Sequence, residues 1–124
     1  MDRRIELVIT KLEADASLAW DAPALAKLVN LSPSRFRHLF KQETGVSPRQ
    51  YLRELGFRKA EVMLATTFLS IKEIADVVGL APLNHFMRNF KKRHGVTPGE
   101  FRIAARLAAS EKLKTKHAAA KNKQ

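Results

Sequence analysis

The stretch IADVVGLAPLNHFMRNFKKRHGVTPGEFR, residues 74–102, joins a short apolar helical pattern, a glycine–proline turn and a longer basic helical pattern. The earlier stretch LAKLVNLSPSRFRHLFKQETGVSPRQYLR, residues 25–53, shows the same features in the same order. A short helix, a tight turn and a longer second helix are the sequence pattern of a helix-turn-helix. The chain therefore contains this unit twice.

The two copies align along most of their length. Their first parts align at an offset of 49 residues, which places Pro33 on Pro82, and their second parts at an offset of 50, which places Gly45 on Gly95. The change of offset indicates one extra residue just after the proline of the second copy. Because each copy is too small to bury a core of its own, we expect the two to share a connecting helix.

Helical periodicity continues outside the repeats, and no alternation typical of strands occurs. Residues 3–15 carry apolar side chains at helical spacing, and Ser47 has the pattern of a cap for a connecting helix over 48–65. Ser70 and Glu73 have the spacing of a capping box. We predict an all-α fold of about seven helices, with two helix-turn-helix subdomains joined by one long helix.

These patterns divide the chain into four parts. We assign residues 1–46 to the first helix-turn-helix subdomain, 47–66 to the connecting helix and 67–109 to the second subdomain. Residues 110–124 carry lysines without an apolar stripe, which predicts a basic, disordered tail. The tail lysines are either a solvated terminus or an arm that attracts phosphates.

The composition favours a polyanionic partner. The 23 lysines and arginines exceed the 12 acidic residues and give a formal net charge of +11, which suits nucleic acid first, and an anionic membrane or acidic protein second. The chain has no cysteine and no apolar run near the roughly 18 residues that a membrane span needs. Histidines lack ligand spacing and no nucleophile–base pair stands out, so we expect no metal, no cofactor and no enzyme.

The second helix of each copy has the properties of a recognition helix, which enters the major groove of DNA and needs one buried side and one polar side. The residues expected on the buried sides are Phe36, Phe40, Phe86 and Phe90. Arginines on the opposite sides can bind guanine in bidentate fashion, and Asn84 can bind adenine similarly. The basic run KKRH, residues 91–94, is expected to attract phosphates.

The length of the connecting helix suits two neighbouring grooves. About 18 residues at about 1.5 Å per residue span roughly 27 Å, not far below the roughly 34 Å between successive major grooves on one face of DNA. Because the two copies differ at their exposed positions, the expected DNA site is asymmetric rather than palindromic.

The pattern IA..VG followed by HF.R.FKK..G.TP.EFR, together with its upstream copy, resembles the DNA-binding domain of the AraC/XylS family of bacterial transcription regulators, over about residues 3–103. The resemblance implies a cytoplasmic, nucleoid-bound regulator such as an activator, with double-stranded DNA and RNA polymerase as partners. By position it implies base contacts from Ser34, Arg35, His38, Leu83, Asn84 and Arg88. It implies phosphate contacts from Ser32, Arg37, Lys41, Lys91 and Lys92. His38 is either such a contact or an exposed bystander.

Three positions depart from the family pattern. Leu80 stands where Phe is usual, which is a substitution within the core. Leu83 stands where a polar residue is common, which favours contact with a thymine methyl group over a hydrogen bond. Gly56 stands where a basic residue is usual, and its weak helix propensity predicts a looser relation between the two halves.

Alternatives stay open at this point. Most family members carry a ligand-sensing or dimerisation domain, so this chain is either a short stand-alone member or the C-terminal domain of a longer regulator, which the abrupt start MDRRIELV favours. The rival function is a non-specific basic nucleic-acid-binding module or a docking module for an acidic partner. Trp20 is expected to pack at a helix junction rather than bind a ligand.

Overall fold

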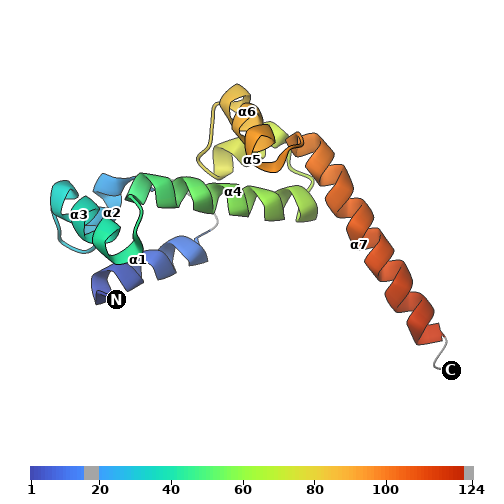
Figure 1. Ribbon diagram of the computed structural model, residues 1–124, viewed down its shortest axis with the longest axis horizontal. Coiled ribbons are helices and arrows are strands. Elements are labelled where there is room, and N and C mark those ends of the chain that lie inside the picture. The colour runs from blue at the N-terminus through green and yellow to red at the C-terminus, as the bar shows by residue number, and fades with distance from the viewer. Residues whose placement is uncertain (16–19, 122–124) are drawn as a thin grey trace.

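The computed structural model describes residues 1–15 and 20–121, with only the backbone described for 117–121, and contains seven helices and no strand within those residues. The helices are α1 (Arg3–Ala14), α2 (Ala22–Leu28), α3 (Pro33–Thr44), α4 (Pro48–Thr66), α5 (Ile71–Val77), α6 (Leu83–His94) and α7 (Pro98–Lys121). Figure 1 shows two groups of helices at the two ends of α4, with α7 leading away from the body. The predicted all-α architecture, with two helix-turn-helix units on one long helix, is confirmed.

The duplication is visible in the elements themselves. Helices α3 and α6 have 12 residues each, and each ends at a glycine in the left-handed conformation, with φ 84° at Gly45 and 78° at Gly95. A side chain would be strained there, which is why glycine ends both helices. The starts differ. The Ser32 hydroxyl accepts a hydrogen bond from the Arg35 amide at 3.2 Å, whereas α6 starts after Pro82 without a side-chain cap.

The connecting helix α4 divides its buried face between two hydrophobic cores. We call α1, α2 and α3 the first unit, and Leu55 of α4 belongs to the core of that unit. We call α5, α6 and the start of α7 the second unit, and Phe57 of α4 belongs to the core of that unit. The four phenylalanines predicted to be buried, Phe36, Phe40, Phe86 and Phe90, are all 0% exposed. Trp20 packs against the first core, as predicted.

At Gly56 the second unit lies close to the backbone of α4. A Cβ atom on Gly56 would lie 2.9 Å from the carbonyl oxygen of Val78 and 3.3 Å from side-chain carbons of Leu80. The missing side chain permits this close contact, and the looser relation between the two halves stays a prediction. Two of the departures from the family pattern, at positions 56 and 80, lie against each other.

Substitution of Gly56 by alanine is expected to lower the free energy of unfolding by about 1 to 3 kcal/mol, as overpacking does. The close contact with the Val78 carbonyl opposes the gain of about 1 kcal/mol that alanine brings to a helix. Gly99→Ala is the matched control, since a Cβ there would lie 3.8 Å from Ile71 Cδ1, at ordinary contact distance. Urea unfolding measures both variants. If Gly56→Ala stabilised the protein as much as Gly99→Ala, the close contact would not constrain α4.

Helix α7 corrects the prediction of a disordered tail. The structure continues α7 as a single helix to Lys121, and residues 122–124 of the predicted tail lie outside the described residues. Residues 100–121 contain no glycine or proline and are rich in alanine, leucine, glutamate and lysine, which are strong helix formers. The missing apolar stripe predicted a lack of packing, and residues 107–116 are indeed exposed, but it did not predict a lack of helix. Among the described helices, none is long and apolar enough to cross a membrane.

Candidate nucleic-acid interface

Helices α3 and α6 each bury two phenylalanines and expose the opposite side. Of the residues predicted to contact bases, the exposed ones are Ser34, Arg35, His38, Asn84 and Arg88, and Leu83 is half-buried. The residues predicted to contact phosphates, Ser32, Arg37, Lys41, Lys91 and Lys92, are all exposed. The side chains of both sets are therefore available for contact, and their roles stay predictions.

The exposed face of α3 forms a surface groove with α1. Ser34, Arg35 and His38 line a hollow of about 400 Å³ together with Arg4 of α1. The Arg4 guanidinium donates to Asp2, with Nε 3.2 Å from Oδ1 and Nη2 3.0 Å from Oδ2. These hydrogen bonds lower the pKa of the Asp2 carboxyl and raise the pKa of Arg4. The sequence analysis missed Arg4, because only the packing of α1 on α3 brings it to this groove.

The exposed face of α6 is more apolar near the start of the helix than near its end. Leu83 is half-buried and Met87 is 38% exposed, while Asn84 and Arg88 are exposed beside them. Asparagine and arginine offer hydrogen-bond donors for base edges, and the two apolar side chains offer contact surface for a methyl group. This face can therefore combine polar and apolar contacts in one groove.

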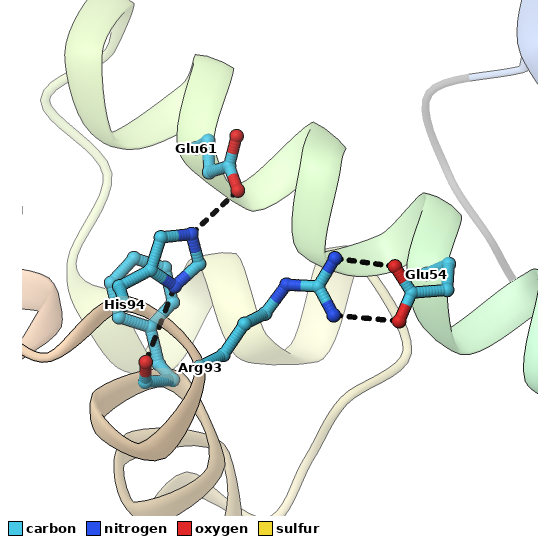
Figure 2. A network of polar contacts seen from close by, with 5 residues as sticks. Glu54, Glu61, Arg93 and His94 are labelled. Atoms are coloured by element: carbon cyan, nitrogen blue, oxygen red, sulfur yellow. Dashed lines mark hydrogen bonds and ion pairs between the residues drawn. The ribbon is translucent and has the colours of Figure 1, made fainter.

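The basic run 91–94 at the end of α6 divides between two roles. Lys91 and Lys92 are exposed, but Arg93 and His94 turn towards carboxylates on α4, as Figure 2 shows. The prediction that the whole run attracts phosphates is therefore wrong for Arg93 and His94. The partners of these two residues lie 39 and 33 positions earlier in the chain, so no local pattern could have revealed the contacts.

Arg93 and His94 fix the end of α6 onto α4. Arg93 donates to both carboxylate oxygens of Glu54, with Nη1 2.6 Å from Oε1, and its guanidinium lies 5.0 Å from the centre of the Phe57 ring. His94 Nε2 lies 2.6 Å from Glu61 Oε1, and its Nδ1 lies 3.2 Å from the carbonyl oxygen of Phe90. These contacts hold α6 in one orientation on α4, and so set where its exposed face points.

The bond between Arg93 and Glu54 predicts a small dependence of stability on acid. Arg93 lowers the pKa of Glu54 below its ordinary value of 4.5. A carboxyl with a depressed folded-state pKa stabilises the fold above its ordinary pKa, and loses that contribution as the pH falls through the folded-state value. Glu54→Gln should reduce this loss between about pH 5 and 3, by less than about 1 kcal/mol because the pair is largely exposed.

Unfolding midpoints measured from pH 7 to pH 3 check this expectation. Glu111→Gln is the matched control, because Glu111 lies on the exposed part of α7 and is in none of the described ion pairs. The same pH profile for Glu54→Gln and Glu111→Gln would show that the pair with Arg93 does not contribute.

Comparison with known proteins agrees with this geometry. A helix-turn-helix domain family matches residues 25–112, which is most of the chain. The matched residues include both α3 and α6. The chain belongs to the AraC/XylS family of transcriptional regulators.

Two relatives are similar to two thirds or more of this chain. It is 37% identical over 83 residues to the arabinose operon regulatory protein of Salmonella typhimurium, which covers 67% of this chain and 30% of that protein. It matches the C-terminal domain of AraT, a response regulator from Geobacillus stearothermophilus, with 29% identity and a TM-score of 0.72 over 83% of this chain and 86% of that one.

A second similar structure contains DNA. The DNA-binding domain of the transcription factor AdpA, solved with a target DNA, matches with 27% identity and a TM-score of 0.72, over 87% of this chain and 96% of that one. The chain thus spans nearly all of such DNA-binding domains, but under a third of the length of the arabinose regulator.

Proposed function

We propose that this chain binds double-stranded DNA in a sequence-specific manner to regulate transcription, with α3 and α6 in adjacent major grooves. The observation that carries the proposal is the pair of exposed recognition faces, each backed by two buried phenylalanines, at the two ends of one helix. The 19 residues of α4 span about 29 Å at about 1.5 Å per residue, close to the roughly 34 Å between successive major grooves. The net charge of +11 favours the phosphate backbone.

The proposal assigns different contacts to the two helices. Base contacts come from Ser34, Arg35 and His38 on α3 and from Leu83, Asn84 and Arg88 on α6. Phosphate contacts come from Ser32, Arg37, Lys41, Lys91 and Lys92. Because the two helices differ at these positions, the two halves of the site, which we call half-sites, have different sequences and the whole site is asymmetric.

The relatives support the setting of this proposal. The arabinose regulator is named for control of an operon, and the AdpA domain was solved with its DNA. We propose by analogy a non-enzymatic regulator in the bacterial cytoplasm, bound to the nucleoid, that acts on RNA polymerase when it activates genes. A signal-sensing or dimerisation domain would belong to the longer protein if this chain is part of one.

Arg88→Ala is expected to relax the base preference at one position of the DNA site, with a loss of about 1 to 3 kcal/mol in binding free energy. Lys92→Ala should instead weaken binding to all sequences alike. It should also reduce the slope of the logarithm of the binding constant against the logarithm of the salt concentration by about one. Fluorescence anisotropy with a panel of single-base variants separates the two effects. If Arg88→Ala kept the preferred sequence and its margin over random DNA, α6 would not read bases through Arg88.

The rival function is a basic module that binds DNA without sequence preference. Specific binders exceed their own non-specific affinity by about 10³ or more at physiological salt, whereas non-specific binding is driven by salt-dependent phosphate contacts alone. Titration of random and selected duplexes over a salt series separates the two functions. The rival would be supported if all duplexes bound equally at every salt concentration.

A further inference from the structure

A groove of about 520 Å³ lies between the two helix-turn-helix units. The connecting helix α4 contributes Arg49, Leu52, Arg53 and Phe57 to its walls, and α6 contributes His85, Phe86 and Asn89. The first unit contributes the segment 20–22, at the start of α2. The polar residues of this groove are absent from the predicted DNA contacts, so the proposed function leaves it without a role.

The groove holds two arginines that form no ion pair with the residues that the structure describes. Arg49 and Arg53 are exposed, and neither takes part in an ion pair within the described residues. Arg93, whose guanidinium packs on the same Phe57 ring as that of Arg53, is by contrast bound to Glu54. The Arg53 guanidinium lies 5.6 Å from the centre of that ring, and this packing leaves its N–H groups available.

One carboxylate, that of Asp21, is among the side chains that line the groove. Asp21 lines the groove, but its Oδ1 already accepts a hydrogen bond from the Ala24 amide at 2.9 Å, as the cap of α2. Asn89 adds a side-chain amide and His85 a ring nitrogen as hydrogen-bond donors. Two guanidinium groups and one carboxylate leave the lining of the groove with an excess of positive charge and donors, which suits an anion with several oxygen atoms.

The position of the groove points to the source of that anion. On α6, His85 and Asn89 follow Asn84 and Arg88 directly, so the groove adjoins the recognition face of α6. The opposite wall is the start of the first helix-turn-helix. A protein that places two helices in successive major grooves on one face of DNA must pass over the minor groove between them. The phosphate backbones of the two DNA strands, which border this minor groove, then lie opposite the middle of the protein.

We propose, resting on the proposed function, that this groove binds the DNA phosphates between the two half-sites. Arg49 and Arg53 contact the phosphate oxygens, and Asn89 and His85 donate hydrogen bonds beside them. These contacts add affinity without base preference, because phosphates carry no sequence information. They also favour one distance between the half-sites, since the bound backbone must meet the groove when both recognition helices are in place.

The test compares two variants with the same change of charge. Arg49→Gln/Arg53→Gln removes both guanidinium groups from the groove, and Lys112→Gln/Lys114→Gln removes two charges from the exposed part of α7. Binding is measured over a salt series with a duplex selected from random DNA. A second duplex carries uncharged methylphosphonates at the central positions, and a third carries the same number at one end.

The groove variant should bind the selected duplex about 10- to 100-fold more weakly near 0.1 M salt, with a salt dependence shallower by about two and an unchanged base preference. The α7 variant should change the slope by much less. Methylphosphonates at the central positions should weaken DNA binding by the unaltered protein but barely change binding by the groove variant. Methylphosphonates at one end should change the binding of both proteins alike. Arg53→Lys, which keeps the charge, should retain most of the slope.

The proposal is overturned if the two double variants have the same slope, or if central methylphosphonates weaken the groove variant as much as the unaltered protein. Circular dichroism and the unfolding midpoint show whether each variant is folded before binding is compared. Failure of the proposed function looks different, because the unaltered protein would then show no preferred sequence. The slopes of the variants can still be compared on random duplexes, so the two failures are distinguishable.

Discussion

Phe90→Ala is expected to lower the free energy of unfolding of the second unit by about 3 to 5 kcal/mol, the cost of removing a large ring from a packed core. Phe90 is 0% exposed, and its ring centre lies 5.7 Å from that of Phe86, 5.4 Å from that of Phe101 and 4.0 Å from the ring of His94. The cavity would lie beneath α6 and would remove the ring on which His94 stacks. Affinity for DNA should fall with stability, because the second recognition helix loses its support.

Urea unfolding followed by circular dichroism measures this effect. The matched control is Phe68→Ala, because Phe68 is 92% exposed and contacts only the guanidinium of Arg106 among the described ring contacts. Its substitution should change the free energy of unfolding by less than about 0.5 kcal/mol. Amide hydrogen exchange should show faster exchange mainly in α5 and α6, since the first unit has its own core. Equal effects of the two substitutions would contradict this description of the second core.

The second large effect is expected from Arg102→Ala, at about 2 to 3 kcal/mol. Arg102 Nε donates to the carbonyl oxygen of Leu64 at 3.1 Å, and its Nη2 donates to those of Leu69 at 2.6 Å and Thr67 at 3.5 Å. The last carbonyls of a helix have no partner within the helix, so a charged donor from α7 both caps α4 and fastens α7 to it. Alanine would leave half-buried acceptors without this donor.

Arg106→Ala is the matched control for Arg102. The Arg106 guanidinium donates to one carbonyl, that of Thr67 at 2.5 Å, so its loss should cost less. Unfolding by urea ranks the two variants, and a salt series with DNA should give the same slope for Arg102→Ala as for the unaltered protein, because Arg102 is committed to the fold. A cost for Arg106→Ala equal to or above that for Arg102→Ala, or a shallower slope for Arg102→Ala, would contradict this role.

The periodic features of the chain were predictable because they depend on neighbours in sequence. Phe86 and Phe90 lie on one face of any helix, so their spacing predicts burial whatever they pack against. The capping box of α5 is equally local: the Ser70 hydroxyl accepts from the Glu73 amide at 3.0 Å, and Glu73 Oε1 accepts from the Ser70 amide at 3.1 Å. The repeat itself predicted two units on one connecting helix, because a single copy could not bury a core.

The features that sequence could not reveal depend on contacts between distant segments. Arg93 and Lys92 are neighbours with the same charge, and Glu54 on α4 becomes the partner of Arg93 only after α6 has packed. Gly56 is a poor helix former by local propensity. Its lack of a side chain lets the carbonyl group of Val78 lie close to α4, and this contact is not visible in the sequence. The positive charge of a residue predicts a possible phosphate contact, whereas the choice between DNA and a carboxylate of the same chain is made by the tertiary fold.

Selection of bound duplexes from a random DNA pool tests the central claim most directly. Two unlike recognition helices at the ends of α4 predict one enriched, asymmetric sequence, with two different half-sites centred about 10 base pairs apart. Repeating the selection with Arg88→Ala should relax one half-site and leave the other intact. Recovery of no enriched sequence, of a palindrome, or of a single half-site would contradict the account of two recognition helices in adjacent major grooves.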